Sequence, residues 1–313
     1  SNPMPAERVI QRTREPQNAD VEMQPGPFGE NAGLQEPGMR GIKTPQQSRV
    51  TADGQYKIDY FTSGRASTEE LDSILSFENW KSDIEGFESY VDKAERFQRR
   101  LPEKERTALE KWIADHGSSD SSDEIPYFDV QTAYDRLDKN AMSRRAELES
   151  GLSKMPAVPA KLLRVASVEV DAAGKTVYNT RIGAGDFISN GNRFLSAAHD
   201  NTYAWQNDNV DAHEALVYYE IDSRSARLLP DTVGNDGEQE WLFMPNRVFA
   251  VDGIAVRNPA GASNEPQRIA LKLREVDAAS VSGPIKDIIT GEPCSSAGSE
   301  FEQKSRDISK WME

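Results

Sequence analysis

Gly237-Glu238-Gln239-Glu240-Trp241-Leu242-Phe243 places two carboxylates two residues apart at the start of an apolar run. Side chains at positions i and i+2 of a strand point to the same face, so the sequence predicts that Glu238 and Glu240 lie side by side. Neighbouring carboxylates repel each other, and their surroundings can let one stabilise positive charge while the other accepts a proton. The pattern is short and common, and a solvated strand edge is its ordinary explanation.

Two polar residues upstream interrupt similar apolar runs. Arg164 lies in Lys161-Leu-Leu-Arg-Val-Ala-Ser-Val168, and Ser196 lies in Phe194-Leu-Ser-Ala-Ala198. The chain order is therefore Arg, Ser, Glu. Together with the proline turn and the apolar run that follow Glu240, these blocks resemble the R-S-E class of mono-ADP-ribosyltransferases, which includes cholera-like toxins and many bacterial effectors. The resemblance covers about residues 160 to 275.

The resemblance implies an enzyme that uses NAD+ as a substrate and transfers ADP-ribose to a host target protein, most often on arginine. Glu240 would stabilise the ribosyl cation left when nicotinamide departs, and Glu238 would deprotonate the acceptor guanidinium. Ser196 would orient Glu240. Arg164 would bind the NAD+ phosphates, because its planar fork makes bidentate contacts that lysine cannot make.

Two aromatic residues and one departure from the family pattern complete the predicted site. Tyr203 and Trp205 are expected to cover the nicotinamide, although such residues are more often part of a core. The family usually has Ser-Thr-Ser, whereas Ser196-Ala197-Ala198 keeps only the first hydroxyl. Two alternatives therefore stay open: the same fold acting as an NAD+ glycohydrolase or on a non-arginine acceptor, and a catalytically silent binding module.

Composition excludes several other classes of function. With 37 Lys and Arg against 52 Asp and Glu, the net charge is −15, which disfavours nucleic-acid partners. One cysteine and three histidines offer no zinc-binding spacing, so no metal is expected. No apolar run is long enough for a Sec signal peptide or a membrane span.

The pattern along the chain predicts an α+β fold: a mono-ADP-ribosyltransferase-like split β-sheet core with an N-terminal helical lobe. Residues 1–64, polar and proline-rich, are expected to be a disordered translocation segment. Residues 65–156 form the helical lobe, 157–280 the β-core, and 281–313 a tail with a short helix. Such a chain is expected to be a monomer, secreted into a host cell by a type III-like route.

Local signals place the individual elements. Ser67 and Glu70 form a capping box, and apolar residues from Ile84 to Ala94 continue the helical period. Pro102 opens another helix that buries Leu109 and Trp112, and a further helix is predicted at residues 130–148. Alternating and β-branched residues predict strands at residues 163–170, 215–221, 240–243, 248–256 and 267–274.

Overall fold

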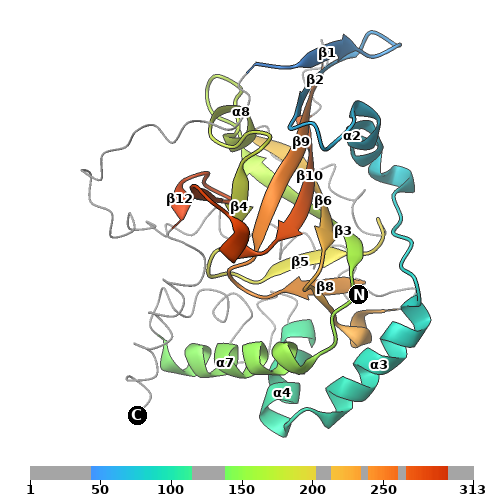
Figure 1. The fold of residues 1–313 in the computed structure, drawn as a ribbon, viewed down its shortest axis with the longest axis vertical. Helices are drawn as coiled ribbons and strands as arrows, with labels where there is room; N and C mark the ends of the chain where they lie inside the picture. Colours follow the sequence, from blue (N-terminus) through green and yellow to red (C-terminus); the bar gives the residue numbers. More distant parts are fainter. Residues whose placement is uncertain (1–43, 115–137, 202–212, 234–238, 260–265, 295–313) are drawn as a thin grey trace.

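The computed structural model describes residues 44–114, 138–201, 213–233, 239–259 and 266–294. It is α+β, with the helices mostly in the N-terminal half and the strands mostly in the C-terminal half (Figure 1). The principal helices are α2 (Thr68–Leu75), α3 (Phe87–Arg100), α4 (Glu103–Ala114), α7 (Lys139–Lys154) and the short α8 (Val177–Thr180). The described residues also contain three 3-10 turns: η1 (Phe77–Asn79), η3 (Pro230–Thr232) and η4 (Ala278–Ser280).

The described strands form one mixed sheet in the order β12-β11-β4-β9-β10-β6-β3-β5-β8-β7, with β2 pairing β9 and β1 pairing β2. The strands are β1 (Gln47–Val50), β2 (Tyr56–Thr62), β3 (Ala160–Glu169), β4 (Phe187–Ser189), β5 (Leu195–Ala198), β6 (Glu214–Ser223), β7 (Arg227–Leu228), β8 (Glu240–Phe243), β9 (Val248–Pro259), β10 (Arg268–Val276), β11 (Ile285–Asp287) and β12 (Pro293–Cys294). The register between β3 and β5 consists of the pair Leu163 and Ala198. The small β5-β8-β7 part is thus nearly split from the main sheet.

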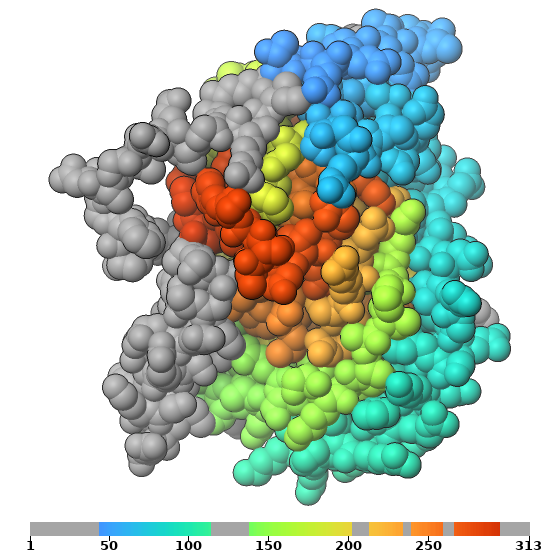
Figure 2. Space-filling model, viewed as in Figure 1, coloured from blue at the N-terminus to red at the C-terminus, as the bar shows by residue number. Residues whose placement is uncertain are grey.

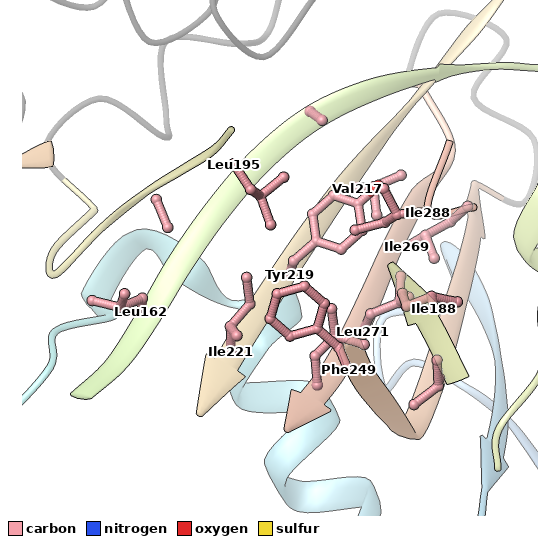
Figure 3. Packing of buried hydrophobic residues seen from close by; sticks show 14 of the residues in the cluster. Leu162, Ile188, Leu195, Val217, Tyr219, Ile221, Phe249, Ile269, Leu271 and Ile288 are labelled. Carbon is pink, nitrogen blue, oxygen red and sulfur yellow. The ribbon is translucent and has the colours of Figure 1, made fainter. Parts of the chain in front are cut away.

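The main core lies on one face of the central strands. Val217, Tyr219 and Ile221 of β6 alternate with residues that face the other side, and they lie in one cluster with Ile269, Leu271 and Phe249 (Figure 3). This alternation is the period-two pattern that the sequence shows for β6 and β10. The opposite face of the same strands is covered by α2, whose Leu71 and Ile74 are fully buried.

Three helices, α3, α4 and α7, cover the β5-β8-β7 part of the sheet. Helices α3, α4 and α7 lie below β5 and β8 in Figure 1 and form the lower surface of the molecule in Figure 2. Leu109 and Trp112 of α4 and Leu148 of α7 pack with Phe194 and Leu242 in one buried cluster. Each helix therefore turns its apolar stripe toward the strands that carry Ser196 and Glu240.

The structure corrects three expectations about the elements. Residues 47–50 and 56–62, expected to be disordered, form β1 and β2, because Ile58 and Tyr60 bury their side chains under α2. Residues 285–287 and 293–294 of the expected tail form strands, while residues 1–43 and 295–313 lie outside the described part. The helix predicted at residues 130–148 is described from Lys139 and continues to Lys154.

The predicted end of that helix at residue 148 was too early, although a glycine follows at position 151. Gly151 instead lies inside α7, where a Cβ atom would meet the Cβ of Glu105 at 3.3 Å. The missing side chain lets α4 and α7 approach closely. The strands predicted at residues 163–170, 215–221, 240–243, 248–256 and 267–274 are all present, with ends that differ by up to three residues.

Candidate active site

Strand pairing brings the first two predicted site residues together. β5 and β8 are antiparallel, with Ala198 opposite Glu240 and Ser196 opposite Leu242. Ser196 and Glu240 consequently share a face of the sheet, and the Ser196 hydroxyl donates a hydrogen bond of 3.0 Å to Oε1 of Glu240. Both side chains are buried, Ser196 with 9% and Glu240 with 1% of its surface exposed.

The backbone at the start of β8 fixes the position of Glu240. Its N–H donates to the hydroxyl of Thr232 at 2.9 Å, and its carbonyl accepts from the N–H of Leu229 at the same distance. Gln239 has a φ of 55°, a left-handed conformation that is uncommon outside glycine. Extended geometry therefore begins at Glu240, and the strand argument that placed Glu238 beside it on one face does not apply.

A second donor reaches Glu240 from the helical lobe. The indole N–H of Trp112, on α4, donates to the same Oε1 atom at 3.3 Å. The indole ring packs edge-on against Phe194, the residue before β5, with ring centroids 5.5 Å apart. The sequence identified Trp112 as part of a buried helix face, but it gave no signal that this side chain meets a residue 128 positions away.

An ion pair between helices fixes α4 and therefore Trp112. Lys154 of α7 contacts both carboxylate oxygens of Glu105, at 2.7 and 2.8 Å, and Ser150 donates to the same carboxylate. Burial alone would raise the pKa of Glu105, but the hydrogen bonds from Lys154 and Ser150 outweigh it and lower the pKa. This contact lies next to Gly151, where the two helices approach most closely.

Arg164, the third predicted site residue, contacts the strand that carries Ser196. Its Nη1 donates to the carbonyl oxygen of Ser196 at 2.9 Å, so the Arg, Ser and Glu positions form a continuous series of contacts. Two buried tyrosines lie on the face of Arg164: Tyr219, its partner in the register of β3 and β6, and Tyr178, hydrogen-bonded to Tyr219. Burial raises the pKa of Tyr219 to about 12, an effect that its bond with Tyr178 and the charge of Arg164 oppose.

His199, three residues beyond Ser196, is held by contacts with two aromatic residues. Its Nδ1 accepts a hydrogen bond of 2.9 Å from the indole of Trp241, and Phe87 packs edge-on against its ring. Burial lowers the pKa of His199, and the charge of Asp200 partly opposes this. An imidazole held by Trp241 orders the end of β5, and the Ser196 hydroxyl donates to Glu240 rather than to this histidine.

The remaining predicted site residues, Glu238, Tyr203 and Trp205, lie outside the described residues. Within the described part of the chain, no group of three His, Cys, Asp or Glu side chains is arranged to hold a metal ion. No described helix is long and apolar enough to cross a membrane.

The arrangement suits the stabilisation of a cation. Burying a carboxylate is costly unless it is hydrogen-bonded, and the hydroxyl of Ser196 and the indole of Trp112 supply such bonds. Both donors are neutral, so they hold the carboxylate without a formal positive charge of their own. A preorganised carboxylate in a medium of low dielectric constant stabilises positive charge that develops near it far more than it would in water.

Comparisons with known proteins give matches among solved structures only. No family model matches the sequence, and no curated protein matches it. The chain is similar to the Vis toxin, an ADP-ribosyltransferase from Vibrio splendidus, with a TM-score of 0.46 and 16% identity over 72% of this chain and 100% of that one. It is also similar to the enzymatic component C2-I of the Clostridium botulinum C2 toxin, with a TM-score of 0.40 and 14% identity over 60% of this chain and 46% of that one. A third similar structure is the type III effector XopAI from Xanthomonas axonopodis pv. citri, with a TM-score of 0.39 and 15% identity over 61% of this chain and 73% of that one.

Proposed function

We propose that this chain is an NAD+:protein mono-ADP-ribosyltransferase that modifies a host protein on arginine as a secreted effector. The observation that carries the proposal is the contact series in which Arg164 binds the carbonyl of Ser196 and the hydroxyl of Ser196 binds Glu240. Three residues spread over 77 positions of the chain thereby meet on two adjoining strands, β3 and β5, and on β8.

Glu240 is assigned the stabilisation of the ribosyl cation. When the bond between nicotinamide and ribose breaks, the electron pair leaves with nicotinamide and positive charge develops on the ribose. The carboxylate of Glu240, oriented by Ser196, would lie against that charge. Only 1% of Glu240 is exposed, so NAD+ reaches the carboxylate after covering side chains move.

Arg164 is assigned the binding of the NAD+ phosphates, and Glu238 the deprotonation of the acceptor arginine. The guanidinium of Arg164 is half-buried and one of its nitrogens is used by the carbonyl of Ser196. A guanidinium has five N–H donors in a planar fork, a geometry that suits charge-assisted hydrogen bonds to phosphate. Tyr203 and Trp205 are assigned to the nicotinamide, and a type III-like route is proposed for delivery.

A reduced rate follows from the residue that faces Glu240 across the strands. Ala198 lies directly opposite Glu240 in the register, where the family pattern has a hydroxyl. The hydroxyl that could support the carboxylate from this position is absent, which leaves Ser196 as the hydroxyl donor that β5 provides.

The test combines two measurements on one set of proteins. The chain is incubated with labelled NAD+ and a eukaryotic cell extract, beside Glu240→Ala and Glu238→Ala, and both nicotinamide release and labelled protein are scored. We expect labelled bands that disappear in both variants, with nicotinamide release surviving in Glu238→Ala alone. Mass spectrometry of the bands should locate ADP-ribose on arginine. Nicotinamide release without labelled bands would indicate a glycohydrolase, and the absence of both release and bands would contradict the proposal.

A further inference from the structure

We propose that Trp112 is a positioning residue for the reaction, and that its indole N–H sets the orientation of the Glu240 carboxylate. This inference rests on the proposed function. Its starting point is that two donors from different parts of the fold converge on one oxygen atom: the Ser196 hydroxyl at 3.0 Å and the Trp112 indole at 3.3 Å both bind Oε1 of Glu240.

Two donors on a single oxygen restrict the carboxylate more than one donor does. The last torsion of a glutamate side chain is broad, so one hydrogen bond leaves the group free to rock about it. A second donor that approaches from α4 rather than β5 removes this freedom. With Oε1 fixed, the direction of Oε2 is fixed as well, which is the condition for a carboxylate to act on a charge that develops at one place.

Trp112 is itself held in place, as a positioning residue must be. Its side chain is 4% exposed and packs against Phe194, and the guanidinium of Arg145 lies over the Phe194 ring, 5.2 Å from its centroid. Arg145 is fully buried and binds the carbonyl of Asn192 in the segment that leads into β5. The helix that carries Trp112 and the strand that carries Ser196 are thus joined through one aromatic ring.

A buried indole also needs an acceptor for its N–H, and that requirement alone could explain a tryptophan hydrogen bond. The chain contains a matched case away from the proposed site: the indole of Trp80 donates to Oε2 of Glu220 at 2.7 Å and is 6% exposed. The two tryptophans differ in which carboxylate they hold, so the same chemical change at each one separates a role in catalysis from a role in packing.

The experiment removes the N–H and keeps the ring. Trp112 is replaced by β-(3-benzothienyl)alanine, in which sulfur takes the place of the indole nitrogen, and the same replacement is made separately at Trp80. Nicotinamide release gives kcat and KM, calorimetry gives the affinity for NAD+, and a melting curve confirms folding. At position 112 we expect kcat to fall about five- to tenfold, as for loss of one hydrogen bond to a charged group, with NAD+ affinity within about twofold.

The control at position 80 should leave kcat unchanged. An unchanged kcat at position 112 would overturn the inference while leaving the transferase proposal intact, because the parent protein would still be active. A rise in kcat would overturn it too, since the indole would then block Glu240 rather than orient it. A parent protein that releases no nicotinamide would remove the proposed function and this inference with it.

The contact itself has a readout that does not depend on activity. In the ¹⁵N-labelled protein, the indole resonance of Trp112 is assigned by its loss in Trp112→Phe. That resonance should shift in Glu240→Gln and should not shift in Glu220→Gln. An indole signal insensitive to Glu240→Gln would show that the hydrogen bond is not formed in solution, and would contradict the inference.

Discussion

Two buried glutamates, each bound by a tryptophan indole, stand in different electrostatic surroundings. Glu220 of β6 accepts from the indole of Trp80 at 2.7 Å and from Nζ of Lys272, on the neighbouring strand β10, at 2.6 Å. Glu240 of β8 accepts from the indole of Trp112 at 3.3 Å and from the hydroxyl of Ser196 at 3.0 Å. One carboxylate is bound by an ammonium group, whereas both of these donors to the other are neutral.

The difference shows how the same contact can serve structure or chemistry. The charge of Glu220 is compensated by Lys272: burial alone would lower the pKa of Lys272, but its hydrogen bond to Glu220 and the charges of Glu220 and Asp222 raise it. Such a pair fixes the register of β6 and β10, and its compensated charges interact only weakly with a ligand. The Ser196 hydroxyl and the Trp112 indole orient Glu240 as dipoles and add no formal charge of their own.

The largest effect is expected at Glu240. Glu240→Gln keeps the shape and both donors but removes the negative charge, so nicotinamide release should fall about a thousandfold, equivalent to about 4 kcal/mol of transition-state stabilisation. Steady-state assays measure the rate, and melting curves should show a protein that is still folded. Release within tenfold of the parent protein would contradict the assignment of Glu240.

The second prediction is the opposite at Glu220: stability should fall while activity is kept. Glu220→Gln removes the nearer and more buried of the two carboxylates that pair with the buried Lys272, the other being Asp222 at 3.3 Å. The free energy of unfolding should therefore fall by about 3 kcal/mol while the folded protein keeps its rate of nicotinamide release. Urea denaturation measures the first quantity. The double variant Glu220→Gln with Lys272→Met should recover part of the loss, and a double variant less stable than the single one would show that the pair is more than a compensated charge.

A smaller effect is expected at Arg164. Arg164→Lys keeps the charge but loses the planar fork, so the KM for NAD+ should rise about tenfold while kcat changes much less. Arg274→Lys is the matched control, since Arg274 of β10 forms an ion pair with Asp252 of β9, away from the proposed site. Equal KM values for Arg164→Lys and the parent protein would remove Arg164 from NAD+ binding.

The smallest effect concerns the third tryptophan contact, between Trp241 and His199. Burial lowers the pKa of His199 below its usual value of 6.5, so the unfolded chain takes up a proton at a higher pH than the folded chain does. Stability from this group is therefore present above about pH 6.5 and is lost as the pH falls below it. His199→Gln, which keeps an acceptor for Trp241, should reduce the drop in melting temperature between about pH 7.5 and about pH 5.5; an unchanged drop would contradict this account.

Most of the elements could be predicted because their signals are local. Period-two alternation located β3, β6, β8, β9 and β10, and the capping box at Ser67 located α2. β1 and β2 were missed because the surrounding polar composition indicated disorder, whereas β2 gains its stability from pairing with β9 and from packing under α2. Residues of the tail were missed for the same reason, since β11 exists through its pairing with β4.

The candidate site was predicted in part. Arg164, Ser196 and Glu240 were chosen from chain order and resemblance, and the structure places them in contact, while their roles stay a prediction. The left-handed Gln239 was not foreseen, because nothing in a Glu-Gln-Glu run distinguishes a strand from a turn followed by a strand. Thr232 and Trp112 were not foreseen as partners of Glu240, since they reach it only when η3 and α4 are placed against β8.

The sequence by itself determined the α+β class, the positions of the central strands and the order of the three polar residues, because side-chain periodicity and residue chemistry are properties of short segments. The tertiary structure alone decided that Glu220 is bound by Lys272 and that Glu240 accepts hydrogen bonds from Ser196 and Trp112. Glu220 and Glu240 look alike in a list of residues, but Lys272 is 52 positions from the first and Trp112 is 128 positions from the second. Contacts over such separations depend on which faces of strands and helices are buried together, and that is settled only when the whole chain folds.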